Sequence, residues 1–298
     1  MSNAIITVGV SASGKTFWAK DFISKNPSYR IISRDDIRRE LLECRLQRPL
    51  EHGELWGKWK FKDERLVSEL VSGAITTNKD KSLDIIIADT NLNKKYRDQL
   101  ESNLLDVGYN IEYKEFPISF EEAIKRDAGR PDGVGHSVIW KQFKQWQEYI
   151  GKPKVAANSS LPKAIIFDVD GTLAQMNGRT PYEWSKVKTD VVRQEIVDMF
   201  KGFKAQGYYM IVMSGRDGIC FNDTAEWLID NSIEYDLLVM RVAGDVRKDS
   251  IVKEELFFKY VANKFDVKLV VDDRPSVCRT WILLGLPLAC VGDPYLEF

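Results

Sequence analysis

The chain has 298 residues, which is enough for two domains with separate cores. Its hydrophobic content of 44% and charged content of 29% are typical of globular proteins, and no apolar run is long enough to span a bilayer. A net charge of −1 argues against a polycation that coats nucleic acid. Two histidines are too few for a His-built zinc site, and four cysteines without close pairing favour the reducing cytoplasm, so we expect a cytoplasmic protein without a membrane partner.

Strand and helix patterns alternate along the first half of the chain. Short apolar runs are typical of buried strands, and segments with helical spacing of apolar residues separate them. This alternation predicts a parallel sheet with helices on both faces. The expected strands are residues 4–9, 29–33, 83–89 and 109–116, and the expected helices are residues 15–25, 34–44, 60–77, 93–105, 119–126 and 137–150.

The pattern then breaks and restarts. Residues 152–162 mix proline with small polar residues and are predicted to link a domain of residues 1–151 to one of residues 163–298. The fold class that we expect is therefore α/β, with two doubly wound parallel-sheet domains. In the second domain the expected strands are residues 164–167, 208–213, 237–240 and 268–271, and the expected helices are residues 190–205, 223–229, 249–263 and 276–284.

A phosphate-binding motif follows the first predicted strand. The run from Gly9 to Thr16 reads GVSASGKT and fits G-x-x-x-x-G-K-[ST], between a strand and a helix. Backbone N–H groups and the helix N-terminus of such a loop face an anion. Lys15 is expected to reach the β- and γ-phosphates of a nucleotide, and Thr16 to coordinate Mg²⁺. The residues predicted to form the cradle are Gly9, Ser13, Gly14, Lys15 and Thr16.

Three further positions suit a phosphoryl-transfer site. Asp35 follows the second strand and is a candidate general base for an attacking hydroxyl, although an aspartate there is also a routine helix cap. Asp89 ends an apolar strand and is a candidate magnesium carboxylate, or simply a solvated strand end. Arg126 and Arg130 flank a glycine-containing loop, which is typical of a lid that stabilises a transferring phosphoryl group, or of a solvated charge run.

The second domain opens with the pattern of an aspartate-based phosphatase. Asp168 and Asp170 end a predicted strand in the run FDVDGTL, so their side chains point the same way. Transfer of a phosphoryl group to an aspartate needs a nucleophilic carboxylate, a second carboxyl group for the leaving oxygen, and Mg²⁺. We assign Asp168 as the nucleophile and Asp170 as the general acid and base, both close to the metal.

Downstream residues supply the remaining groups in order. Ser214 follows an apolar strand and is expected to bond the phosphate, while Lys253 screens the nucleophile. Asp272 and Asp273 follow another strand and are expected to hold magnesium. The segment between Asp170 and Ser214 is too short for a large cap domain, so the site is open enough to admit the end of a polymer.

Several stretches of the chain resemble a known family. They read ISRDDIRR, ADTNLN, GKPK, KAIIFDVDGTLAQMNGR, GDVRKDSIVKEELF and FDVKLVVDDR. With these the chain resembles, over nearly its whole length, the bacteriophage-type bifunctional polynucleotide kinase/phosphatase, in which a P-loop kinase precedes a phosphatase of the haloacid dehalogenase type. The chain departs from the family pattern in two places. The phosphate loop reads VSAS where the family usually has a Pro-Gly pair, and the predicted lid segment, DAGRPDGVGH, is richer in glycine than expected.

The resemblance implies an end-healing enzyme. It transfers phosphate from ATP or another nucleoside triphosphate to 5′-hydroxyl ends of DNA or RNA and removes 3′-phosphates, with Mg²⁺, so that a nucleic acid ligase can seal the ends. It also implies a homo-oligomer. By the same resemblance Asp35 activates the hydroxyl, Arg38 steers it, and Arg130 reaches the ATP phosphates with Arg126 nearby. The residues implied to surround the 3′-phosphate are Arg179, Ser214, Arg216, Asp249 and Lys253.

Two other functions fit the same motifs. A small-molecule kinase fused to a metabolite phosphatase would carry the same catalytic groups in closed pockets. A scaffold that only binds ends would carry a damaged motif, and we find none. Whether DNA or RNA is preferred is open, because the same pockets accept either backbone unless a 2′-hydroxyl is contacted.

Overall fold

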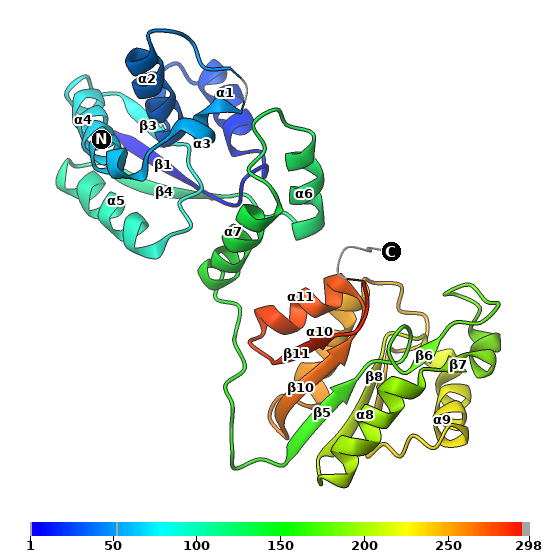
Figure 1. The fold of residues 1–298 in the computed structure, drawn as a ribbon. Coiled ribbons are helices and arrows are strands. Elements are labelled where there is room, and N and C mark those ends of the chain that lie inside the picture. The colour runs from blue at the N-terminus through cyan, green and yellow to red at the C-terminus, as the bar shows by residue number, and fades with distance from the viewer. Residues whose placement is uncertain (1, 52, 294–298) are drawn as a thin grey trace. The chain divides into compact units, whose positions relative to one another are not determined.

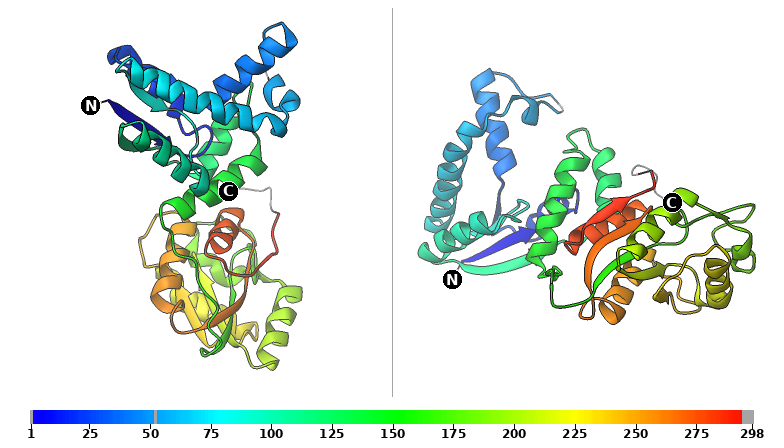
Figure 2. Two further views of the ribbon diagram at one scale, coloured as in Figure 1. Left: turned by 90° about the vertical axis from the view of Figure 1, so that its left-hand side faces the viewer. Right: turned by 60° about the horizontal axis from the view of Figure 1, so that its bottom comes forward.

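The computed structural model describes residues 2–51 and 53–293, and the chain divides into two compact units. The first unit is Met1–Lys152 and the second is Pro153–Phe298. Each unit is a parallel sheet covered by helices (Figures 1 and 2). The expected fold class, α/β with doubly wound parallel sheets, is confirmed. Among the described residues, no helix combines the length and the apolar character that crossing a bilayer requires.

The sheet of the first unit has four parallel strands in the order β2-β3-β1-β4. Along β1, Ala4 and Ile6 face the larger core, whereas Ile5 faces a smaller core that contains Ala19 of helix α1. Both faces of the sheet are therefore buried. The strands are β1 (Asn3–Val8), β2 (Tyr29–Ile32), β3 (Asp84–Ile87) and β4 (Asn110–Glu115). The helices are α1 (Lys15–Lys25), α2 (Arg34–Leu46), α3 (Glu54–Lys58), the 3₁₀ helix η1 (Phe61–Asp63), α4 (Glu64–Asp80), α5 (Lys94–Asp106), α6 (Phe120–Ala128) and α7 (His136–Tyr149).

The region before α4 differs from its prediction. A helix was expected from residue 60, but Lys60 is extended, a 3₁₀ turn follows it, and α4 begins at Glu64. Sequence analysis also did not predict the short helix α3. It is held by Leu55, which is buried in the core, and such a single anchor produces no helical periodicity.

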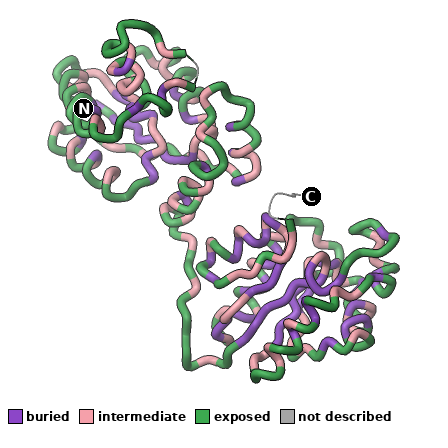
Figure 3. Tube along the Cα trace, in the orientation of Figure 1, coloured by how far each residue is buried: buried purple, intermediate pink, exposed green. Residues whose placement is uncertain are grey.

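The sheet of the second unit has five parallel strands in the order β11-β10-β5-β8-β9. Along β5, Ile166 packs with α10 and α11, and Ile165 packs with α8 and α9 (Figure 3 shows the buried strands). The strands are β5 (Lys163–Phe167), β6 (Ala174–Gln175), β7 (Val191–Val192), β8 (Tyr209–Ser214), β9 (Leu237–Met240), β10 (Asp266–Asp272) and β11 (Leu288–Cys290). The helices are η2 (Trp184–Thr189), α8 (Gln194–Ala205), η3 (Gly218–Cys220), α9 (Phe221–Asp230), α10 (Asp249–Tyr260) and α11 (Pro275–Leu283).

The start of the expected helix 190–205 was wrong. Asp190 is extended, and the next two residues form β7, which pairs with β6 in an antiparallel ribbon. Only this ribbon and η2 lie between β5 and α8, so the described residues contain no cap domain there.

The residues predicted to link the domains are bonded to the second unit. The N–H of Val155 donates to the carbonyl of Leu284 at 2.8 Å, and the N–H of Asn158 donates to Asp266 Oδ1 at 3.3 Å. Val155 also packs against the core of that unit. The segment therefore runs along the second unit as part of it.

Candidate active sites

The run from Gly9 to Thr16 forms a loop around the N-terminus of α1. Gly14 has a φ of 98°, in the left-handed region that favours glycine. Lys15 is buried, and its Nζ donates to the carbonyl of Val10 at 2.6 Å and to Ser13 Oγ at 3.2 Å. The loop thus holds its lysine against its own backbone, while Thr16 is exposed in the first turn of α1.

Charged groups from four segments gather at this loop. Burial lowers the pKa of Lys15 to about 8, and the charges of Asp89, Arg130 and Asp35 also act on it. Asp89 accepts two hydrogen bonds from the backbone N–H of Arg34, at 3.0 and 3.3 Å. Burial, together with the charge of Asp35, raises the pKa of Asp89 to about 7. The structure therefore brings Lys15, Asp35, Asp89 and Arg130 to one edge of the sheet.

Asp35 and Arg38 form a pair at the start of α2. Arg38 Nη1 lies 2.5 Å from Asp35 Oδ1, and Arg38 also bonds Glu64 through Nε at 2.8 Å and Nη2 at 3.0 Å. Glu64 further accepts from Arg34 Nη2 at 2.8 Å and from Trp59 Nε1 at 2.7 Å. Although burial opposes its ionisation, these guanidiniums hold the pKa of Glu64 at about 2. Sequence analysis missed Glu64, because a glutamate at the start of a helix carries no pattern of its own.

The two arginines that we predicted to belong to a lid, Arg126 and Arg130, lie in different surroundings. Arg126 is exposed on α6 and pairs with a glutamate one turn earlier at 2.7 Å, whereas Arg130 lies in the following loop. The buried carboxylate of Asp127 accepts from the N–H groups of residues 134 and 135, at 3.1 and 2.8 Å. This loop is therefore tied to α6 by hydrogen bonds, and of the two arginines it is Arg130 whose charge reaches Lys15.

In the second unit, Lys253 lies among three carboxylates. Its Nζ lies 2.7 Å from Asp168 Oδ1, 2.9 Å from Asp272 Oδ2 and 3.7 Å from Asp249 Oδ2. Burial raises the pKa of Asp168 well above its usual value, and Lys253 only partly offsets this effect. Burial alone would lower the pKa of Lys253, but the three carboxylates outweigh it and raise that pKa. The lysine is thus a buried cation that holds Asp168 in place.

Two of these carboxylates can share a metal ion with the neighbouring Asp273. Oxygen atoms of Asp168, Asp272 and Asp273 all lie within 4.8 Å of one another. A set of carboxylate oxygens is the donor set that Mg²⁺ prefers, so the residues present fit the ion. A Cβ at Gly171 would lie 1.9 Å from Asp273 Oδ2, so only glycine leaves room for this carboxylate. Asp170, which we had expected near the metal, is not in this group.

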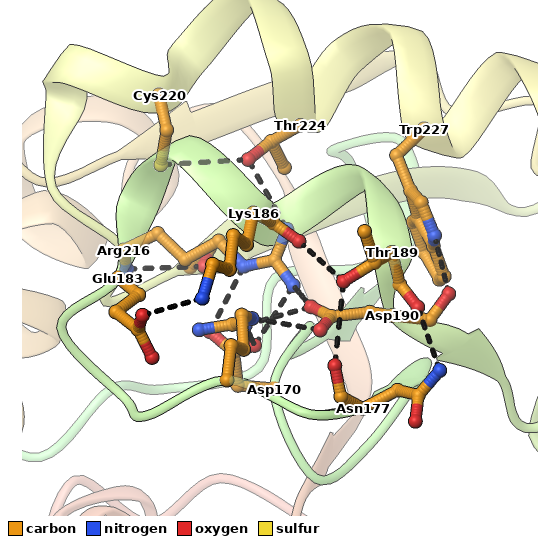
Figure 4. A network of polar contacts seen from close by, with 12 residues as sticks. Asp170, Asn177, Glu183, Lys186, Thr189, Asp190, Arg216, Cys220, Thr224 and Trp227 are labelled. Atoms are coloured by element: carbon orange, nitrogen blue, oxygen red, sulfur yellow. Dashed lines mark hydrogen bonds and ion pairs between the residues drawn. The ribbon is translucent and has the colours of Figure 1, made fainter.

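Asp170 instead belongs to a network of two carboxylates and two arginines (Figure 4). Asp170 Oδ1 lies 2.8 Å from both Arg179 Nη2 and Arg216 Nη2, and Arg216 Nε bonds Oδ2 at 2.9 Å. Asp190, on the other side, accepts from Arg179 at 2.6 and 2.7 Å and from Arg216 at 2.5 Å. Although burial opposes it, the two arginines hold the pKa of Asp170 below its ordinary value. The hydroxyl of Ser214 lies at the same place and accepts from the N–H of Arg216 at 3.2 Å.

Asp190 is the second residue that sequence analysis missed. Its side chain is fully buried, like those of both arginines, and its carbonyl accepts from Trp227 Nε1 at 2.9 Å. We had placed it at the start of an expected helix, residues 190–205. The two valines that follow it were the available signal of a strand, but an aspartate at a helix start is so common that Asp190 did not stand out.

Comparisons with known proteins follow the same division. Residues 5–153 match the family model described as an AAA domain, and residues 162–294 match the model of the phosphatase domain of the polynucleotide kinase PNKP. A protein of Autographa californica nuclear polyhedrosis virus, named as a bifunctional polynucleotide kinase/RNA ligase, is 28% identical over 99% of this chain. The chain spans 43% of the length of that relative.

Two solved structures also resemble the chain over its length. A chain in a structure titled as the Pnkp1/Rnl/Hen1 RNA repair complex is 29% identical, with 99% of this chain and 97% of that chain covered and a TM-score of 0.47. A second structure, of a Pnkp1/Rnl/Hen1 complex, is 28% identical, with 98% and 97% covered and a TM-score of 0.46. The two family models together match nearly the whole sequence, so the first half of the chain belongs to the AAA-domain family and the second half is similar to the phosphatase domain of the polynucleotide kinase PNKP.

Proposed function

We propose that this chain heals nucleic acid ends, by phosphorylating 5′-hydroxyl groups and removing 3′-phosphates. One observation carries the proposal. In one unit the charge of Asp35, which is paired with Arg38, acts on Lys15 of the phosphate loop, and in the other Asp168 lies against Lys253 and the metal-compatible carboxylates. Opposite phosphate chemistries on one chain fit an enzyme that edits both kinds of end. We assign the kinase to residues 1–151 and the phosphatase to residues 163–298; of the predicted linker, residues 152–162, the part from residue 153 onward is grouped with the second unit.

In the kinase reaction, the 5′-hydroxyl oxygen attacks the γ-phosphorus, and the bond from that phosphorus to the bridging oxygen of ADP breaks. Asp35 accepts the hydroxyl proton, which suits an exposed carboxylate beside the phosphate loop. Arg38 orients the hydroxyl. Lys15 and Arg130 neutralise the charge of the transferring phosphoryl group, with Arg126 as a further nucleotide contact.

The nucleotide is held by the loop residues. Backbone N–H groups between Gly9 and Gly14 face its phosphates, with the Ser13 hydroxyl beside them. Thr16 and Asp89 are the residues that we assign to Mg²⁺, which when bound neutralises the β- and γ-phosphate oxygens. ATP is the donor that we propose, and another nucleoside triphosphate would fit the same loop.

In the phosphatase reaction, an oxygen of Asp168 attacks the 3′-phosphorus and the bond to the 3′-oxygen breaks. Asp170 donates a proton to that oxygen and then accepts one from the water that hydrolyses the aspartyl phosphate. Lys253 holds Asp168 in the attacking position. Asp168, Asp272 and Asp273 hold Mg²⁺, which when bound neutralises charge on the phosphate.

Four groups surround the incoming phosphate in this proposal. They are Arg179, Ser214, Arg216 and Asp249, of which the arginines are bonded to Asp170 in the free enzyme and hold its pKa low. An acid needs a proton at the start of the reaction. A phosphate that draws the two guanidiniums toward itself weakens their hold on Asp170 and raises its pKa, so substrate binding itself prepares the acid.

The partners that we propose follow from this activity. Ends with a 5′-phosphate and a 3′-hydroxyl are what a nucleic acid ligase joins, and the viral relative is named for both a kinase and an RNA ligase. We therefore expect this chain to work before a ligase, on DNA or RNA ends, in the cytoplasm. The four cysteines are all free thiols, as in a reducing compartment.

An oligonucleotide with a 5′-hydroxyl and a 3′-phosphate tests the proposal. Incubated with Mg²⁺, it should lose the 3′-phosphate with or without ATP and gain a 5′-phosphate only with ATP, as mass spectrometry with fragmentation can locate. Lys15→Ala should lose only the kinase activity, and Asp168→Asn only the phosphatase activity. An oligonucleotide that emerges unchanged in both arms refutes the proposal and favours metabolite substrates.

A further inference from the structure

The segment between α2 and α4 carries aromatic and basic side chains beside the kinase site. Residues 56–62 read WGKWKFK, with three aromatic residues, three lysines and no acid. Trp56 is 43% exposed and Phe61 is 81% exposed, and Lys58, Lys60 and Lys62 are exposed as well. Large aromatic side chains normally add to a core, so two that remain at the surface among lysines need another explanation.

Trp56 touches the catalytic pair. The guanidinium carbon of Arg38 lies 5.3 Å from the centre of the Trp56 ring, and the same guanidinium lies 2.5 Å from Asp35. The indole is therefore separated by one side chain from the carboxylate to which we assign the proton of the 5′-hydroxyl. The Trp56 ring is therefore within reach of the first bases of a nucleic acid whose 5′ end lies at Asp35.

The same segment is firmly anchored. Trp59 lies between the exposed aromatic residues, is buried, and donates through Nε1 to Glu64, which also bonds Arg38. On the other side, Glu54 accepts from Arg48 at 2.8 Å and pairs with Lys58 at 2.6 Å. Glu64 thus bonds both Trp59 of the aromatic segment and Arg38. These bonds hold the segment at a fixed position relative to Arg38.

We propose that Trp56 and Phe61 form a stacking site for the nucleobases that follow a 5′-hydroxyl end, with Lys60 and Lys62 on the backbone phosphates. The ligand is single-stranded nucleic acid. Aromatic rings stack on any base because every base has a π-face, and lysines between them neutralise the backbone. This inference rests on the proposed kinase activity and adds to it the place where the polymer lies.

The test measures the kinase KM for a single-stranded oligonucleotide with Trp56→Ala and Phe61→Ala. Loss of one stacking contact should raise KM between about 5-fold and about 150-fold. Trp56→Phe should retain most of the affinity because it keeps a ring. Leu105→Ala, a truncation of another exposed apolar residue of this unit, is the matched control and should change nothing. The KM for ATP should stay constant in all variants.

A second substrate separates stacking from the positioning of Arg38. If Trp56 stacks on bases, an oligonucleotide whose first nucleotides are abasic offers it nothing to stack on. The kinase KM for that substrate should then be the same for Trp56→Ala as for the unchanged protein. Equal losses on the intact and abasic substrates would mean that Trp56 only positions Arg38, and would overturn the proposal. The double variant Lys60→Gln/Lys62→Gln should bind the oligonucleotide with a weaker salt dependence. The slope of the logarithm of the binding constant against the logarithm of the salt concentration should become shallower by about 1.4. An unchanged slope argues against contacts between these lysines and the phosphates.

The remaining outcomes are also distinguishable. If the unchanged protein phosphorylates no oligonucleotide, the proposed function fails before the stacking site is tested. If it does, and Trp56→Ala and Phe61→Ala behave like Leu105→Ala, the stacking site alone is refuted. An unchanged KM for ATP reports in every case that the first unit of the variant is folded.

Discussion

The carboxylates that we assign to catalysis have opposite surroundings in the two units. In the first unit the side chain of Asp35 is 58% exposed and has one arginine partner. In the second unit Asp168 is buried against Lys253, and Asp170 is bonded by two fully buried guanidiniums. The kinase site is a surface with a few oriented groups, whereas the phosphatase site is a set of buried charges. Substitution of the exposed Asp35 in the first should therefore change activity with little effect on stability, and substitutions in the second should change activity and stability together.

The largest expected loss is in the phosphatase reaction of Asp170→Asn. Without a group that protonates the 3′-oxygen and then activates water, the rate on a 3′-phosphate end should fall by about 100-fold to about 10,000-fold. An aryl phosphate has a better leaving group and should lose less in the first step. The ratio of the two rates is the measurement, and equal losses on both substrates would contradict the role of acid.

Asp190→Ala should remove stability as well as activity. It leaves two buried guanidiniums with only Asp170 between them, and breaking such a buried network costs about 3–5 kcal/mol. Urea unfolding of the full chain, followed by phosphatase activity, measures this loss of stability. The urea concentration at the midpoint of the transition should be lower in the variant than in the unchanged protein. Asp190→Asn keeps an acceptor and should lose less. An unchanged midpoint in the alanine variant would mean that the network contributes nothing to the fold.

Glu64→Gln should act on the kinase reaction without touching its chemistry. It weakens two bonds that orient Arg38, and a small misplacement of such a group costs about 10-fold to about 100-fold in rate. The expected signature is a lower kcat with little change in the KM for ATP and full phosphatase activity. Glu69→Gln, one turn on and paired with an exposed arginine, is the matched control and should be silent.

The smallest expected effect is the pH dependence of stability from the same residue. The pKa of Glu64 is about 2 in the folded chain against an ordinary 4.5, because the guanidiniums outweigh burial. Its contribution to stability is therefore complete above about pH 4.5 and is lost as the pH falls toward 2. The difference in unfolding free energy between the protein and Glu64→Gln should shrink over that range. A constant difference would contradict the lowered pKa.

The sequence predicted what is encoded locally. The glycine–lysine loop, the paired aspartates after β5 and the alternation of strands with helices are patterns of adjacent residues, and the fold class that they predicted is confirmed. Glu64 could not be predicted, because its role depends on Arg38, 26 positions away. Asp190 could not be predicted either. Its extended backbone precedes β7, whose pairing with β6 is a contact between distant segments.

The hydrogen bonds of the segment after α7 bear on how the chain can be divided. Backbone bonds reach Lys152 from the first unit, and the next begins at Val155, which packs in the second core. A fragment that starts at the first strand of the second unit, Lys163, would strip Val155 from that core and remove the bond to Leu284. The useful place to cut is Pro153, ten residues before the strand where a boundary drawn from secondary structure would fall.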